Sequence, residues 1–367
     1  MNLTQKILLL ITALIGLALV SCNQPTPDLS KGWLDSAERT LLDFARIDTV
    51  RIGDLLDRIR SGHFINIHSV IVSKDNQVLV EEYFDGPDVR GRTREFNREA
   101  RHEWRSVSKS ITSLAIGMTI DQGLIPSVDE PISYFFPEYK ELFDSTKNQV
   151  RIKDLLSMQS GISWQQVGHK GSDEAKMEGS RNFIRYVLSQ PMSEEPGTLF
   201  YYNSGNTVLL AGIIKSATGV HLDEYVEEHL FEPLGIEDHR WWMSTGSLPQ
   251  AHAGLVMRPI DMMKIGQLLL NNGNWNGQSI ISKEWIDESM KDRIEGRRNY
   301  GYQWWLRSFT INAAEYQAYF AAGNGGQYLF CFPALDLAVV FTAGNYGQGF
   351  NRPQAIQMLE EYILPAL

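Results

Sequence analysis

The sequence predicts an α+β fold, in which one antiparallel sheet built from both ends of the chain is flanked by helices and joined to a mostly helical lobe. Two observations support this prediction. β-Branched and aromatic residues concentrate in residues 65–84 and again after residue 300, and the stretch between them has apolar residues at helical spacing. Strands at both ends around a helical middle favour a sheet lobe of about residues 34–105 and 295–367 and a helical lobe of about residues 106–294. A cleft between two lobes is the usual place for a binding site.

The N-terminus has the form of an export signal. Its apolar run, Ile7 to Val20, is shorter than the roughly 20 apolar residues of a membrane-spanning helix. The run ends close to Cys22, and residues 19–22 (LVSC) resemble the bacterial lipobox. This resemblance implies a lipoprotein signal peptide over residues 1–22 and lipidation of Cys22. The protein would then be exported and lipid-anchored at the bacterial cell envelope, on the periplasmic side or at the outer membrane. An ordinary signal peptide that contains a cysteine is the alternative.

The elements that follow begin with a tether. Residues 23–33 are expected to fill this role, because the polar, proline-containing stretch NQPTP at residues 23–27 suits a linker. Apolar residues within 34–47 are spaced for one face of a helix. Residues 65–84 are expected to form a β-hairpin, because two β-branched runs are separated by the polar residues 74–76.

The middle of the chain is expected to be helical. Its first helix runs from Ser106 to Gln122 and stops at Gly123, a residue type that commonly follows a helix. The other predicted helices cover residues 152–158, 181–188, 207–217, 222–230, 259–271 and 283–291. Residues 165–180 are a long polar connection, for which a lid over the site and a plain solvated loop are both open.

The C-terminal part returns to strand patterns. Strands are predicted at residues 300–306, 317–321, 327–332 and 337–342, and a helix at 353–362 closes the chain. Tyr302, Trp304 and Trp305 lie on the first of these strands and are candidates for a wall of the cleft. Alternation along a strand places half of such residues in the core.

Composition and charge exclude several classes of function. The formal net charge is −10 and becomes −11 without residues 1–22, and no basic cluster is present, which argues against a nucleic-acid partner. Cys331 is the only cysteine besides Cys22, so the folded domain has no disulfide within it. The eight histidines show no metal-ligand spacing such as HExxH, and no metal or other cofactor is expected.

Residues 104–110 (WRSVSKS) place a serine and a lysine three residues apart at the start of the first predicted helix. Ser106 and Lys109 therefore face the same side. A serine hydroxyl becomes a strong nucleophile when a neighbour takes its proton, and a lysine can do so when burial lowers its pKa. Backbone N–H groups at a helix start can also stabilise a developing oxyanion. The alternative is a capped helix with a solvated lysine.

Two later segments add weight to this pattern. They are PGTLFYYNSGNTVLLAGIIKSATG at residues 196–219 and AAGNGGQYLFCFP at residues 321–333. In this order the three segments resemble the Ser-x-x-Lys, Tyr-x-Asn/Ser and Lys-Thr-Gly or His-x-Gly elements of the serine β-lactamase and penicillin-binding-protein superfamily, class C β-lactamases and their relatives in particular. The resemblance covers nearly everything after Leu34. It implies a β-lactamase-like fold over residues 34–367.

The resemblance also implies roles for residues of the first two elements. Ser106 is the nucleophile that becomes acylated, Lys109 activates it, and Tyr202 relays the proton. Ser204 takes the Asn/Ser position that supports the lysine. Reading Tyr201 and Asn203 as the pair is the alternative.

The third element departs from the family pattern. Asn324, Gly325 and Gly326 stand where Lys-Thr-Gly stands, and the N–H groups of Gln327 and Ser106 would form the oxyanion hole. Asn324 lacks the positive charge with which penicillin-binding proteins and β-lactamases generally hold a substrate carboxylate. The resemblance therefore favours esterase-type members and those similar to 6-aminohexanoate-dimer hydrolase.

The implied function is hydrolysis of an ester or amide bond, in a small-molecule or peptide-like substrate, through an acyl-serine intermediate. With no Ser-Asp-Asn motif and no class A general-base glutamate, deacylation would fall to Tyr202 with Lys109. Membrane contact would occur only through the lipid anchor. The alternatives are a penicillin-binding or D-alanyl peptidase-type enzyme and a non-catalytic cell-envelope binding domain of the same fold. The Gly-x-Ser-x-Gly motif of α/β-hydrolases is absent.

Overall fold

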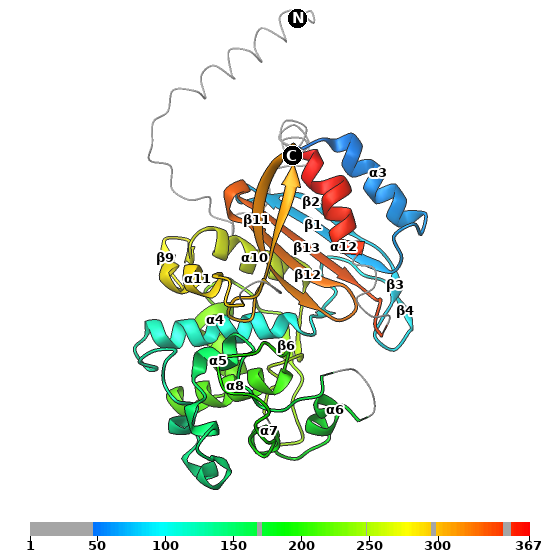
Figure 1. Ribbon diagram of the computed structural model, residues 1–367. Coiled ribbons are helices and arrows are strands. Elements are labelled where there is room, and N and C mark those ends of the chain that lie inside the picture. The colour runs from blue at the N-terminus through cyan, green and yellow to red at the C-terminus, as the bar shows by residue number, and fades with distance from the viewer. Residues whose placement is uncertain (1–46, 167–170, 247, 295–298, 348–353) are drawn as a thin grey trace, which may run out of the picture. The chain divides into compact units, whose positions relative to one another are not determined.

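The computed structural model describes residues 47–166, 171–246, 248–294, 299–347 and 354–367 (Figure 1). The predicted signal peptide with Cys22, the tether, and the helix expected over residues 34–47, apart from Ile47 itself, lie outside these residues. All described residues belong to the unit Ser36–Leu367. No helix among them is long and apolar enough to span a membrane.

An antiparallel sheet organises the fold. Within the described residues it has six strands in the order β10-β11-β12-β13-β1-β2. The strands are β1 (Ile67–Lys74), β2 (Gln77–Tyr83), β10 (Trp305–Ile311), β11 (Ala314–Gly323), β12 (Gln327–Phe332) and β13 (Leu337–Ala343). β1 pairs with β13, with Val70 opposite Phe341 and Val72 opposite Val339. The predicted α+β class, with a sheet made from both chain ends, is confirmed.

Helices cover both faces of this sheet (Figure 1). α3 (Thr49–Arg60) and α12 (Gln354–Met358) lie on one face, and α10 (Pro259–Leu270) lies on the other. Because successive strand residues point to opposite faces, Val339 packs in the cluster that includes α3 and α12, and Val340 packs in the cluster that includes α10. Because both faces of the sheet are buried, the sequences of these strands are continuous apolar runs.

The remaining elements connect and extend this framework. The helices are α4 (Val107–Asp121), α5 (Ile152–Leu156), α6 (Asp173–Glu178), α7 (Phe183–Leu188), α8 (Ser204–Thr218), α9 (Leu222–Val226) and α11 (Lys283–Ser289). π-helical turns follow at Glu227–Phe231 and Leu359–Ile363. The short strands are β3 (Gly86–Pro87), β4 (Thr93–Arg94), β5 (His102–Glu103), β6 (His239–Trp241), β7 (Leu255–Met257), β8 (Asn274–Trp275) and β9 (Gln278–Ser279). β5, β7 and β6 form a separate small sheet in that order.

α3 lies where the sequence analysis placed no element. Asp48 caps it, because its side chain accepts hydrogen bonds from two backbone N–H groups of the first turn. Ile52, Leu55 and Ile59 then face the sheet. A capping aspartate followed by apolar residues at this spacing is a helix signal that the sequence does contain.

The position of α10 corrects the predicted lobe boundary. This helix falls within residues 106–294, the range assigned to the helical lobe, yet it packs on the sheet. Its Gly266 lies so close that an added Cβ would be 2.9 Å from Leu329 Cδ1 and 3.1 Å from Ala338 Cβ. α10 therefore belongs structurally with the sheet.

The strand predicted at residues 300–306 is wrong over most of its length, because β10 begins only at Trp305. Gln303 has a φ of +65°, which is left-handed and incompatible with a strand. Tyr302 and Trp304 are buried in the core, whereas Trp305 is half-buried. An apolar and polar pattern cannot reveal a left-handed residue, so this boundary was not predictable from it.

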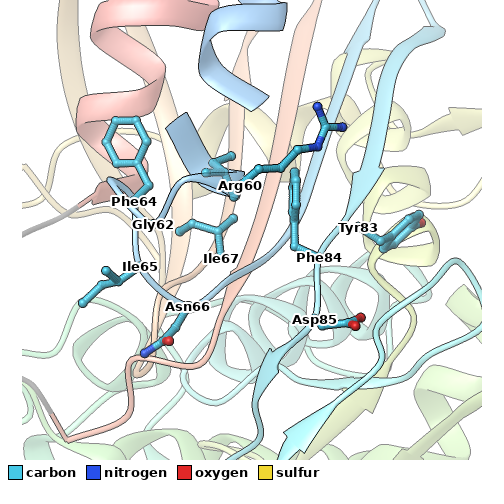
Figure 2. Close-up of a pocket in the computed structure, with 10 residues that line it drawn as sticks. Arg60, Gly62, Phe64, Ile65, Asn66, Ile67, Tyr83, Phe84 and Asp85 are labelled. Carbon is cyan, nitrogen blue, oxygen red and sulfur yellow. The ribbon is translucent and has the colours of Figure 1, made fainter. Parts of the chain in front are cut away.

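A cavity of about 570 Å³ opens beside the edge strand β2 and the end of α3 (Figure 2). Phe64, Ile67 and Phe84 line it together with Arg60 and Asp85. None of the predicted site residues lines this cavity, so the predicted site lies elsewhere.

Candidate active site

Ser106 and Lys109 lie in contact at the start of α4, the helix between the sheet and the helical lobe (Figure 1). Lys109 Nζ donates hydrogen bonds to Ser106 Oγ, at 3.0 Å, and to the carbonyl oxygen of His252, at 2.7 Å. The lysine is only 1% exposed, while Ser106 is half-buried. Lys109 is therefore not the solvated lysine of the alternative interpretation.

The segment before Ser106 is held rigidly. Trp104 is buried, its backbone N–H donates to the carbonyl of Leu255, and its indole N–H donates to the carbonyl of Met257. Arg105 has a φ of +50°, a left-handed conformation that costs a non-glycine residue roughly 1–3 kcal/mol. An ion pair of 2.7 Å with Glu103 holds the Arg105 side chain. These contacts with β5 and β7 fix where Ser106 begins its helix.

Tyr202, which directly precedes the cap of α8, lies beside the lysine. Lys109 Nζ is 5.1 Å from the centre of the Tyr202 ring. Tyr201 instead is 48% exposed and lines a separate cavity of about 280 Å³. Asn203 is buried and its side chain caps α8 by accepting from the N–H of Gly205. Of the two predicted registers, the geometry brings Tyr202 and not Tyr201 to Lys109, although no hydrogen bond among the described residues joins the Tyr202 hydroxyl to Ser106 or Lys109.

Ser204 does not make the contact expected of it. The family resemblance implies that Ser204 supports Lys109, but the Ser204 hydroxyl donates to Glu174 Oε1 at 2.9 Å. Its backbone N–H donates to Gln166 Oε1 at 3.0 Å. Because Ser204 occupies the first turn of α8 on the side that faces α6, its side chain reaches the glutamate and not the lysine.

α6 brings two carboxylates to this side of the site, which sequence reasoning missed. His252, fully buried, donates from Nε2 to Glu178 Oε1 at 3.1 Å, and Glu174 Oε1 lies 3.8 Å from the same nitrogen. The hydrogen bond from His252 is the main cause that lowers the pKa of Glu178 from its usual value. Ligand atoms of the three groups lie within 4.8 Å of one another, a spacing that a cation could use. Hydrogen bonds, including those from Ser204 and Gln166 to Glu174, already engage these groups.

The third element forms the tight turn between β11 and β12. Gly325 and Gly326 have φ values of +95° and +100°, which other residues rarely adopt. A Cβ added to Gly323, at the end of β11, would lie 2.3 Å from the carbonyl oxygen of Trp104. The turn is thereby packed against the segment that leads into Ser106. Asn324, the residue in place of the family's cation, is exposed.

The predicted oxyanion donors come from the two segments that meet here. Gln327, at the start of β12, is fully buried. Its side-chain amide donates to the carbonyl of Ala343 and accepts from the N–H of the same residue, which ties it to β13. The backbone N–H of Ser106 has no hydrogen-bond partner among the described residues. This donor is therefore free for a ligand.

A comparison with protein families supports the assignment made from these elements. The Beta-lactamase family model matches residues 65–361, which is most of the chain. The chain belongs to the Beta-lactamase family. The predicted superfamily and the β-lactamase-like fold are thus confirmed.

Several proteins similar to this Beta-lactamase family member are named as hydrolases or esterases. It is 25% identical over 296 residues to the 6-aminohexanoate-dimer hydrolase of Paenarthrobacter ureafaciens, covering 74% of this chain and 70% of that protein. A family VIII carboxylesterase has a similar structure, with a TM-score of 0.69, 17% identity and coverage of 86% of this chain and 96% of the other. EstCE1, a hydrolase with promiscuous acyltransferase activity, has a TM-score of 0.71 at 15% identity, covering 89% of this chain and all of the other. The chain is therefore a member of a hydrolase family.

In this Beta-lactamase family member, two buried histidines join β1 to β5, the strand that leads into Ser106. His68 Nδ1 lies 2.9 Å from His102 Nε2, and His68 stacks on Phe96. Burial, assisted by the nearby charge of Arg94, lowers the pKa of His68 to about 4. Burial and the neighbouring His68 lower the pKa of His102 to about 3. Both rings are therefore neutral in the folded protein near pH 5.

We expect this pair to make the fold acid-sensitive. Below its ordinary pKa of about 6.5, each histidine takes up a proton in the unfolded chain but not in the folded one, so stability falls from about pH 6.5 toward pH 4. Each should remove about 2 kcal/mol between pH 7 and pH 5, measured by urea unfolding. The variant H68Q/H102Q should lose this part of the pH dependence. An unchanged pH dependence in that variant would contradict the assignment.

Proposed function

We propose that this protein is a serine hydrolase that cleaves an ester or amide bond through an acyl intermediate on Ser106. The observation that carries the proposal is the 3.0 Å contact between Ser106 Oγ and the Nζ of a lysine that is 1% exposed. A buried amine held against a serine hydroxyl at a helix start is one arrangement that activates a serine as a nucleophile. The hydrolase names of the relatives support the same reaction class.

In the proposed reaction, Ser106 Oγ attacks the substrate's carbonyl carbon while Lys109 Nζ takes the hydroxyl proton. The new C–O bond places negative charge on the carbonyl oxygen, and the N–H groups of Ser106 and Gln327 stabilise it. The bond to the leaving group then breaks, and the leaving group receives the proton through Tyr202. Water next attacks the acyl ester as Tyr202, together with Lys109, accepts its proton. The bond between the carbonyl carbon and Ser106 Oγ then breaks, and Oγ takes up that proton, which releases the acid and restores Ser106.

The uncharged third element supports an esterase or amidase over a D-alanyl peptidase. Asn324 is exposed and carries no charge, so it offers no ion pair to a substrate carboxylate. We therefore propose a substrate that has no carboxylate at this point.

A pair of covalent probes tests the proposal. The full chain, kept in detergent, is treated with a fluorophosphonate or with a penicillin, and the adduct is measured by intact mass and mapped by peptide analysis. We expect a fluorophosphonate adduct on Ser106 and no long-lived penicillin adduct. The control variant Ser113→Ala should still be labelled on Ser106. Ser113 is a buried serine on the same helix, and its hydroxyl has no hydrogen-bond partner in the described chain.

The other outcomes separate the competing functions. A long-lived penicillin adduct on Ser106 would favour a penicillin-binding enzyme. The absence of an adduct from both probes would favour a non-catalytic binding domain of this fold. An adduct on another serine would show that this other serine, and not Ser106, is the nucleophile.

A further inference from the structure

Gln303 connects α4, which carries Lys109, to α8, whose cap directly follows Tyr202. It is 2% exposed and has a φ of +65°, in the short loop closed by the antiparallel bridge between Tyr300 and Trp305. Residues held in such conformations persist where the surrounding structure over-determines them, and they gather at active sites. Its contacts therefore indicate what it holds. The inference rests on the proposed function, because it concerns how Lys109 and Tyr202 are placed.

The first contact is with the nucleophile helix. Ser110 Oγ, on α4, donates to the backbone carbonyl of Gln303 at 2.7 Å, and this bond is buried. Ser110 directly follows Lys109 in the sequence. The bond therefore fixes α4 at the residue next to the lysine.

The second set of contacts reaches α8 and α5. Thr207 Oγ1, in the first turn of α8, donates to Gln303 Oε1 at 2.9 Å. Gln303 Nε2 donates to the carbonyls of Leu155 and Leu156 at 3.1 Å and 2.9 Å. Its backbone N–H also donates to Leu156, at 3.0 Å. Both amide atoms and both backbone polar groups of Gln303 are thus used.

The same segment touches the tyrosine directly. Trp305, two residues after Gln303, stacks on the Tyr202 ring with centres 5.9 Å apart and planes 20° apart. Lys109 Nζ lies 5.1 Å from the centre of the same ring. The segment from Gln303 to Trp305 therefore forms hydrogen bonds with α4 and with α8, and it packs on the Tyr202 ring.

We propose that Gln303 is a positioning residue that sets the relative placement of Lys109 and Tyr202. Among the described residues it forms no hydrogen bond with Ser106 or Gln327, so we expect it to act through α4 and α8. Displacements of about 1 Å at reacting groups can lower rates by about 100-fold. Loss of the hydrogen bond from Ser110 or of the one from Thr207 should therefore slow acylation without changing any group that takes part in it.

Each of these two hydrogen bonds can be removed without changing Gln303 itself. Thr207→Val deletes the α8 hydroxyl at constant volume, and Thr207→Ser restores it. Ser110→Ala removes the hydrogen bond between α4 and the carbonyl of Gln303. Ser113→Ala is the matched control on α4, since it removes a buried hydroxyl that has no partner among the described residues. Fluorophosphonate labelling rates of Ser106 are measured across pH, well below each variant's unfolding temperature.

We expect Thr207→Val and Ser110→Ala to lower the labelling rate about 10- to 100-fold and to shift the midpoint of its pH profile. Thr207→Ser and Ser113→Ala should behave as wild type. If Thr207→Val only lowers the unfolding temperature and keeps the wild-type rate and pH profile, Gln303 is a purely structural hub and the proposal is wrong. If wild type itself is not labelled at Ser106, the proposed function fails and this inference fails with it.

Discussion

Ser106→Ala should reduce turnover by about 10,000-fold or more while leaving the fold intact. The acyl intermediate requires the hydroxyl oxygen, and no other described hydroxyl contacts Lys109 Nζ. The substitution should be harmless to folding, because the Ser106 side chain makes no capping hydrogen bond to α4 and is half-buried. Hydrolysis of a p-nitrophenyl ester and thermal unfolding measured on the same preparation check both parts.

The matched control for this variant is Ser113→Ala, which should keep wild-type turnover. Full activity in Ser106→Ala would show that the nucleophile is another group. A loss of activity accompanied by a lower unfolding temperature would call for Ser106→Gly, which leaves even less side chain. That variant should be equally inactive if chemistry, and not folding, has been lost.

Lys109→Met should slow acylation by about 100- to 10,000-fold, which is the usual effect of losing a general base. Methionine has nearly the length of lysine and suits a site that is 1% exposed, so packing is largely kept. It can neither accept the Ser106 proton nor donate to the carbonyl of His252. Stopped-flow measurement of the acylation phase tests this directly.

Lys109→Arg separates proton transfer from simple electrostatics. Arginine keeps a positive charge but does not give up its proton, since its pKa lies above 12. If Lys109 accepts the serine proton, Lys109→Arg should be about as slow as Lys109→Met. Near-normal acylation in Lys109→Arg would instead mean that the charge alone matters.

The sequence predicts the local features of this site well. The hairpin that became β1 and β2, and the strand β12 at residues 327–332, follow from β-branched runs bounded by turn residues. Ser106 and Lys109 meet because residues three apart share a helix face. Helical spacing does not bring Tyr202 to them. Only the family resemblance predicted it there, and Lys109 Nζ lies 5.1 Å from the centre of its ring.

The features that were missed depend on contacts between distant segments. Glu178 and His252 are 74 residues apart and meet only because α6 packs beside residue 252. Ser204 has the expected residue type, but the packing of α6 turns its hydroxyl toward Glu174. Gln303 has a left-handed φ in a short loop and forms hydrogen bonds with residues of three helices that are distant in the sequence. No local pattern encodes such relations.

The pairing of β1 with β13 has a consequence for how the chain folds. Val70 and Phe341 are partners, so more than two thirds of the chain lies between two adjacent strands. Contacts of such long range carry a large loop-closure entropy, and they slow folding. During synthesis, which proceeds from the N-terminus, β1 has no β13 to pair with until nearly the whole chain has been made. The turn that carries Gly325 and Gly326 also comes from these last strands, so the proposed oxyanion donor Gln327 becomes available only late in synthesis.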